Sequence, residues 1–174
     1  MDWREKLFGR VLVKCDSPGT KNGKFENIAT SEALSDCVED GEGAVCGIYF
    51  SFANISDTSD DFGVRLEEVY KKVFPRLKVV EVVLWAHVGT PEGPVEREAG
   101  FRRSLTGKPW FAVPFHDVDT KISSADSGWM WMDPTHEVSR PDLVLVKLEQ
   151  NNVMTTTDNY INAETVSFKI RALT

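Results

Sequence analysis

Two long apolar runs, separated by an amphipathic stretch, dominate the hydrophobic pattern of the chain. Residues 44–52 and 77–86 are nearly continuous in apolar side chains, which is typical of strands covered on both faces of a sheet. Between them, apolar residues recur at the spacing of one helix face until Pro75 ends the pattern. This face consists of Phe62, Leu66, Val69, Tyr70 and Val73. The pattern predicts a strand, a helix and a second strand parallel to the first.

Shorter patterns extend this unit on both sides. Residues 9–15 alternate between apolar and polar and predict an early strand, and within the polar segment that follows only residues 28–38 could hold a short helix. A helix is expected at 95–105, and residues 143–148 and 153–157 flank a polar turn as in a strand hairpin. The order of elements predicts an α/β fold with a mixed central sheet and flanking helices.

Length, charge and hydropathy narrow the class of protein. A chain of 174 residues fits a single domain spanning residues 1–174. The formal net charge of −7 argues against a nucleic-acid partner, which would be bound mainly through its phosphates. No apolar run reaches the roughly 18 residues of a membrane span, and the first residues lack an apolar signal core. We therefore expect a soluble protein of the cytoplasm, with the nucleus as a second location.

Three sequence tracts carry a resemblance to a known family. They are Tyr49-Phe50-Ser51 at the end of the first apolar run, the Pro-Trp-Phe-Ala-Val-Pro-Phe-His-Asp tract at 109–117, and Val-Ser-Arg-Pro-Asp-Leu-Val at 138–144. In this order they resemble the nucleoredoxin and tryparedoxin group of thioredoxin-like proteins, over about residues 9–160. The resemblance implies a thioredoxin-like three-layer fold.

The resemblance fails at the residues that would carry the family's chemistry. In that group a Cys-x-x-Cys motif follows Tyr-Phe-Ser at the start of the next helix, where the helix dipole favours a thiolate. Counting forward from Tyr49 places the motif on residues 55–58, and counting backward from Phe62 places it on residues 56–59. The positions concerned are Ile55, Ser56, Asp57, Thr58 and Ser59, and none is a cysteine. We therefore expect no catalytic residue here, because a serine hydroxyl cannot begin thiol exchange.

The resemblance also implies a surface that could face a partner. The family's cis-proline maps onto Pro141, and the residue before it is Arg140, opposite an acidic loop that includes Asp57. Trp129 and Trp131 lie in a longer segment than the family usually has, and they could fill the core or contact a partner. The predicted partner-facing surface thus consists of Arg140, Pro141, Trp129 and Trp131.

The remaining candidates for chemistry are three cysteines and a few polar clusters. Cys15 and Cys46 lie on apolar faces of expected strands and are interpreted as core thiols, while Cys37 is the best candidate for exposure. The oxygen-rich run at 54–61 lacks the order of a calcium loop, and the three histidines lie far apart in sequence. We expect neither a metal ion nor a cofactor.

Two functional hypotheses remain. The first is a redox-inactive thioredoxin-like module that binds a protein partner through the former active-site surface. The second is a thiol-disulfide oxidoreductase or redox regulator that works through one of the remaining cysteines. Accessible thiols of low pKa would favour the second hypothesis.

Overall fold

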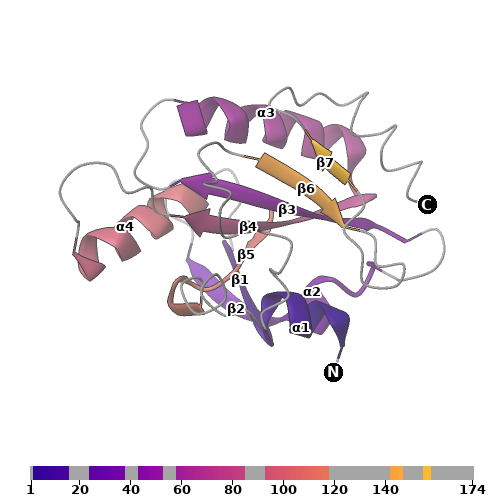
Figure 1. Ribbon diagram of the computed structural model, residues 1–174, viewed down its shortest axis with the longest axis horizontal. Coiled ribbons are helices and arrows are strands. Elements are labelled where there is room, and N and C mark those ends of the chain that lie inside the picture. The colour runs from indigo at the N-terminus through magenta and orange to yellow at the C-terminus, as the bar shows by residue number, and fades with distance from the viewer. Residues whose placement is uncertain are drawn as a thin grey trace.

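A seven-stranded mixed sheet forms the centre of the molecule. The computed structural model describes residues 2–15, 24–37, 43–52, 58–84, 93–117, 142–146 and 155–157. The strands are β1 (Val11–Cys15), β2 (Phe25–Ala29), β3 (Val45–Phe52), β4 (Leu77–Leu84), β5 (Phe111–Ala112), β6 (Asp142–Val146) and β7 (Thr155–Thr157). The helices are α1 (Trp3–Phe8), α2 (Thr30–Ala33), α3 (Thr58–Val73) and α4 (Pro94–Leu105). Across the sheet the strands follow the order β2-β1-β5-β4-β3-β6-β7, as can be followed in Figure 1.

The direction of the strands changes on either side of a parallel centre. β3 runs parallel to β4, with Tyr49 paired to Glu81, and β4 runs parallel to β5. β6 joins β3 in the antiparallel direction, with Asp142 beside Phe50, and β7 continues the hairpin. The antiparallel β1–β2 hairpin extends the opposite edge by pairing β1 with β5. This arrangement confirms the mixed sheet, the central parallel pair and the C-terminal hairpin that the sequence predicts.

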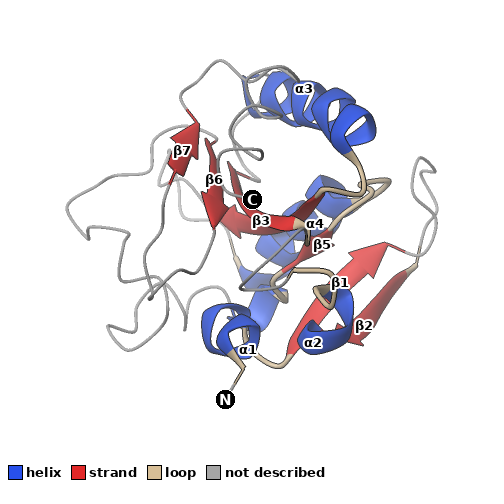
Figure 2. Cartoon of the chain, turned by 90° about the vertical axis from the view of Figure 1, so that its right-hand side faces the viewer, coloured by secondary structure: helices blue, strands red, loops and turns tan. Residues whose placement is uncertain are grey.

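Helices cover both faces of the sheet and make three layers. α3 lies on one side of the sheet, and α1 and α2 lie on the other side (Figure 2). The α3 side chains meet the side chains of β3, β4 and β6 in one buried cluster, while α4 packs on β1, β4 and β5 through Phe101 and Leu105. On the opposite face α1 contributes Leu7 and Phe8 to a third cluster, and α2 contributes Ala33. Alternate residues of β3 and β4 are therefore buried on opposite faces of the sheet, which explains why the sequences of these two strands are continuously apolar.

The central helix has the face that its sequence predicts. All five apolar residues of that face are buried, and the helix ends at Val73, two residues before Pro75. The buried face consists of Phe62, Leu66, Val69, Tyr70 and Val73. The residues between these positions include exposed Val64 and basic Lys71 and Lys72, so α3 is amphipathic and buries one side only.

Three elements, α1, β2 and the two-residue strand β5, are not predicted by the sequence analysis. α1 has only six residues, and its start is fixed by the Asp2 side chain, which accepts a hydrogen bond from the Arg4 backbone N–H. β2 is an edge strand whose side chains are half-buried or exposed, so its sequence lacks an apolar alternation. The short helix expected within residues 28–38 is present as α2, although it has four residues.

Candidate functional site

Three chain segments that carry the predicted site converge at one end of the sheet. β3 ends at Phe52, α3 begins at Thr58, and β6 begins at Asp142, the residue that pairs with Phe50. The carboxyl end of β3, the first turn of α3 and the start of β6 are therefore neighbours. This is where the resemblance in sequence would place a Cys-x-x-Cys motif and the proline before β6.

Most of the predicted site residues fall outside the described residues. These are Ile55, Ser56, Asp57, Trp129, Trp131, Arg140 and Pro141. Thr58 and Ser59 are the first two residues of α3. The partner-facing surface of Arg140, Pro141, Trp129 and Trp131, the placement of a former redox motif at positions 55–59, and the cis bond at Pro141 remain predictions.

Beneath this end of the sheet lies a buried carboxylate that the sequence analysis did not single out. Glu81, in β4, is 1% exposed and accepts three side-chain hydrogen bonds. The Ser51 hydroxyl donates to Oε1 at 2.5 Å, the Ser104 hydroxyl donates to Oε1 at 3.0 Å, and the Trp110 indole N–H donates to Oε2 at 2.8 Å. We call these four residues the Glu81 cluster. Its members come from β4, β3, α4 and the residue that precedes β5.

The surroundings of Glu81 shift the pKa of its carboxyl group in opposite directions. Burial raises the pKa of the Glu81 carboxyl above its ordinary value, because the charged form loses its hydration. The hydrogen bonds from Ser51, Trp110 and Ser104 lower that pKa, as does the positive charge of Lys108, but burial outweighs them. The cluster thus holds a carboxyl group that binds its proton more tightly in the folded protein than in the unfolded chain.

Contacts between aromatic rings connect the Glu81 cluster to α3. We call Tyr49, Phe62, Tyr70 and Trp110 the aromatic cluster. The Tyr49 ring stacks on Phe62 at a centroid distance of 5.5 Å and meets the edge of Trp110 at 5.9 Å. Trp110 also meets Tyr70 at 5.8 Å, with the rings nearly perpendicular. Such aromatic pairs hold α3 at a fixed position on the sheet.

α3 lies close to Tyr49 because it carries a glycine, Gly63, at the point of contact. A Cβ atom on Gly63 would lie 3.3 Å from the Tyr49 hydroxyl oxygen and 3.6 Å from Lys108 Nζ. Lys108 Nζ lies 5.8 Å from the centre of the Trp110 ring and 3.4 Å from Glu67 Oε1. Lys108, in the segment before β5, therefore contacts α3 through Glu67 and lies over the ring of Trp110.

The Glu81 cluster is suited to positioning rather than to contact with a substrate. Glu81 and Ser51 are 1% and 3% exposed, so neither side chain reaches solvent. Ser51 is the penultimate residue of β3 and lies two residues before the start of the 53–57 segment. The hydrogen bond from Ser51 thus joins Glu81 of β4 to the end of β3 that precedes residues 53–57. The sequence signal was the charge itself, since Glu81 interrupts an otherwise apolar run from Val79 to Leu84.

The three cysteines lie in the interior. Cys15 and Cys46 are buried, as the sequence predicts. Cys37, the best candidate for exposure from the sequence, is also buried, because it is 2% exposed and belongs to the same buried cluster as Cys46. The acidic neighbours of Cys37 misled the prediction: Asp36 turns outward to Lys78, at 3.1 Å from Nζ, while Cys37 turns inward.

The described segments contain neither a metal-ligand group nor a helix that could span a membrane. Within them, no three histidine, cysteine, aspartate or glutamate side chains gather closely enough to hold a metal ion. No helix of this part of the chain combines the length and the apolar character that crossing a bilayer requires.

Comparison with known proteins identifies the fold. No protein-family model matches the sequence, and no curated protein matches it either. Among solved structures, tryparedoxin II from C. fasciculata is similar with a TM-score of 0.56 and 19% identity, over 97% of this chain and 90% of that chain. Thioredoxin from Wuchereria bancrofti is similar with a TM-score of 0.53 and 20% identity, over 95% of this chain and 98% of that chain. The chain therefore has a thioredoxin-like fold.

Proposed function

We propose that residues 1–174 form one thioredoxin-like domain that has no dithiol chemistry and acts by binding a protein partner. The binding surface comprises the segment that replaces the dithiol, at positions 55–59, together with Arg140, Pro141, Trp129 and Trp131. The similarity of fold to tryparedoxin II supports the location of this surface at the end of β3. The sequence tracts at 49–51, 109–117 and 138–144 support a nucleoredoxin-like member of the thioredoxin-like proteins.

The burial of every thiol is the observation that carries this proposal. Thiol exchange needs a thiolate that can reach the sulfur of a substrate disulfide. The chain has three cysteines, all of which are buried, and none stands between Ile55 and Ser59. The same observation weighs against the second hypothesis, an oxidoreductase that works through a remaining cysteine. Three free thiols also fit a reducing compartment, and we place the protein in the cytoplasm.

Two measurements separate the hypotheses. In a disulfide-reduction assay with a dithiol donor, the protein should give no turnover above the rate of the donor alone. In the native protein, a bulky aromatic disulfide reagent should react with none of the three thiols until the chain is unfolded. Turnover, or a thiol that reacts rapidly in the native state, would refute the redox-inactive reading.

The binding surface is tested by crosslinking from defined positions. A photoreactive side chain at Asp57 should capture a specific protein from a lysate, and Arg140→Glu should reduce that capture. Val95 on α4 is 77% exposed and provides the matched control position, from which the same protein should not be captured. Equal capture from position 57 and position 95, or none from position 57, would count against this surface.

A further inference from the structure

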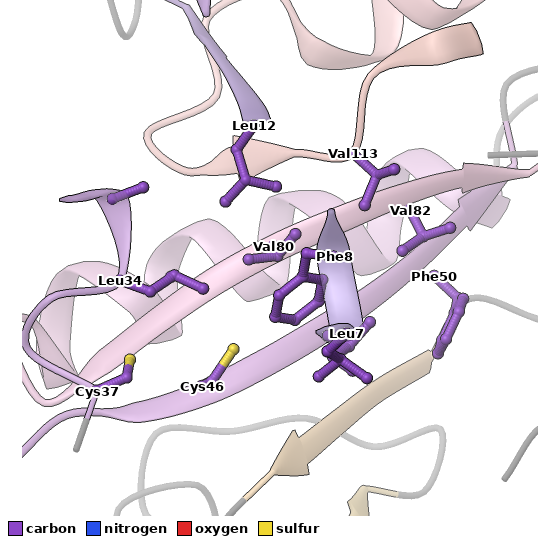
Figure 3. Close-up of a cluster of buried hydrophobic side chains, with 12 residues drawn as sticks. Leu7, Phe8, Leu12, Leu34, Cys37, Cys46, Phe50, Val80, Val82 and Val113 are labelled. Carbon is purple, nitrogen blue, oxygen red and sulfur yellow. The ribbon is translucent and has the colours of Figure 1, made fainter. Parts of the chain in front are cut away.

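Cys37 and Cys46 bring two thiols into one buried cluster. Cys46 is the second residue of β3, and Cys37 follows the turn after α2. Their side chains are 2% and 1% exposed and lie with Leu34 and Phe8 on the face of the sheet covered by α1 and α2 (Figure 3). Cys15 is buried in β1 but is not a member of this cluster.

Backbone contacts hold the two cysteines together. The Cys37 N–H donates to the Leu34 carbonyl at 2.9 Å, which fixes the turn after α2. The Ala44 N–H donates to the Asp36 carbonyl at 2.8 Å, so the chain returns beside Asp36 just before it enters β3. Asp36 and Ala44, which precede the two cysteines by one and two residues, therefore lie side by side.

A salt bridge also joins Asp36 to the sheet. The Asp36 carboxylate lies 3.1 Å from Lys78 Nζ, and Lys78 is the residue of β4 that pairs with Cys46. Asp36 thus ties the residue before Cys37 to the strand position beside Cys46. The Cys46 thiol also responds to its neighbour: a side-chain hydrogen bond with Cys37, followed by burial, raises its pKa well above the ordinary value.

We propose that Cys37 and Cys46 are a modification site, at which hydrogen peroxide converts the two thiols to an intramolecular disulfide. One sulfur attacks a peroxide oxygen, so that an S–O bond forms, the O–O bond breaks and water leaves. The second sulfur then attacks the sulfenic acid, so that the S–S bond forms, the S–O bond breaks and a second water leaves. The two thiol protons leave in these waters, the sulfurs are oxidised by two electrons, and the peroxide is reduced.

The burial of the pair selects the oxidant. A disulfide oxidant must bring its sulfur into line with a thiolate, which the 1% and 2% exposures of the cysteines prevent in the closed fold. Hydrogen peroxide is small and neutral, and it reaches the pair when the segment around α2 opens transiently. Oxidation is therefore slow and stoichiometric, in contrast to the rapid exchange of a catalytic dithiol.

The site is separate from the proposed partner surface. Cys46 stands at the amino end of β3, whereas the lost dithiol segment follows the carboxyl end of the same strand. Six residues of extended chain between Cys46 and Phe52 correspond to about 20 Å. The proposal therefore goes beyond the proposed function, and its test uses no partner.

Mass spectrometry of the peroxide-treated protein tests the proposal directly. Trypsin leaves Cys37 and Cys46 together in the peptide 25–65 and places Cys15 in the peptide 15–21. After treatment, peptide 25–65 should lose the mass of two hydrogens, and the thiols titrated in denaturant should fall from three to one. Cleavage after Glu39 and Glu42 should then give two fragments that separate only when a reductant is added.

Three variants assign the bridge. Cys15→Ala should keep the mass loss unchanged, whereas Cys37→Ala and Cys46→Ala should each abolish it. The result for the unmodified chain and for Cys15→Ala does not depend on whether the other two variants fold. A bridge that includes Cys15, a crosslinked dimer, sulfinic acid without a bridge, or three intact thiols after prolonged treatment would each overturn the proposal.

Discussion

Glu81 accepts a hydrogen bond from Ser51 near the end of β3, and substituting it by glutamine should change how stability depends on pH. The pKa of Glu81 is raised in the folded protein. Its contribution to the free energy of unfolding is therefore fully present at pH values below the pKa in the unfolded chain, about 4.3. That contribution is lost as the pH rises through the pKa in the folded protein. Glu81→Gln cannot titrate. We expect urea unfolding between pH 4 and pH 8 to show the stability of the unmodified protein falling relative to Glu81→Gln as the pH rises. Parallel stability curves would contradict the raised pKa.

The hydrogen bonds of Glu81 are tested by a second substitution at the same position. Glu81→Leu leaves the Trp110 indole N–H without its acceptor in a buried site, whereas a glutamine oxygen can still accept that bond. An orphaned buried donor costs about 1–3 kcal/mol, so Glu81→Leu should be less stable than Glu81→Gln by that amount at low pH.

A double-mutant cycle with Trp110→Phe isolates this bond. Trp110→Phe should cost less free energy of unfolding in the Glu81→Leu background than in the unmodified protein. Equal costs in the two backgrounds would show that the indole N–H contributes nothing through Glu81.

At the scale of elements, α3 is held by its apolar face. Leu66 on this face is fully buried, and Leu66→Ala should lower the free energy of unfolding by about 2–5 kcal/mol, because it removes buried methyl groups and leaves a cavity. Val64 lies two residues away and is 52% exposed, so Val64→Ala is the matched control and should change stability by less than about 0.5 kcal/mol. Denaturant titration measures both. Similar losses for the two variants would argue against the observed helix face.

The main elements could be predicted because their patterns are long. β3, α3 and β4 each extend over eight residues or more, and their burial leaves a clear apolar period in the sequence. α1 and β2 have six and five residues, and β2 faces solvent at the sheet edge, so neither leaves such a period. Short elements of this kind are fixed by tertiary contacts rather than by their own sequence.

The candidate site could be predicted in part. The absence of cysteine from positions 55–59 can be read directly from the sequence, whereas the Glu81 cluster depends on side chains from four separate segments that meet only in the fold. The burial of Cys37 was missed for the same reason, because the pairing of Asp36 with Lys78 joins segments about forty residues apart.

At the scale of the whole molecule, the thioredoxin-like fold offers a scaffold into which a Cys-x-x-Cys pair can be introduced. The double substitution Ser56→Cys and Ser59→Cys follows the backward count from Phe62, and Ile55→Cys with Thr58→Cys follows the forward count. We expect the first pair to form a disulfide readily at the start of α3, since its Cβ atoms should lie within about 4.5 Å. Thiol titration after mild oxidation measures this for both variants. Bridging by the second pair alone would show that the forward count is correct.

The sheet order has a consequence for how the chain is assembled during synthesis. β1 is made early, yet its partner on the side of the sheet centre is β5, and the paired residues Val13 and Ala112 are about 100 residues apart. At the usual speed of a ribosome, the β1–β2 hairpin must wait about 5–20 s before β5 exists to receive it. During that interval Leu12, Val13 and Cys15, which the finished sheet buries, have no sheet to cover them. The β1–β2 hairpin is therefore one segment of the nascent chain that a chaperone for short apolar strands could protect.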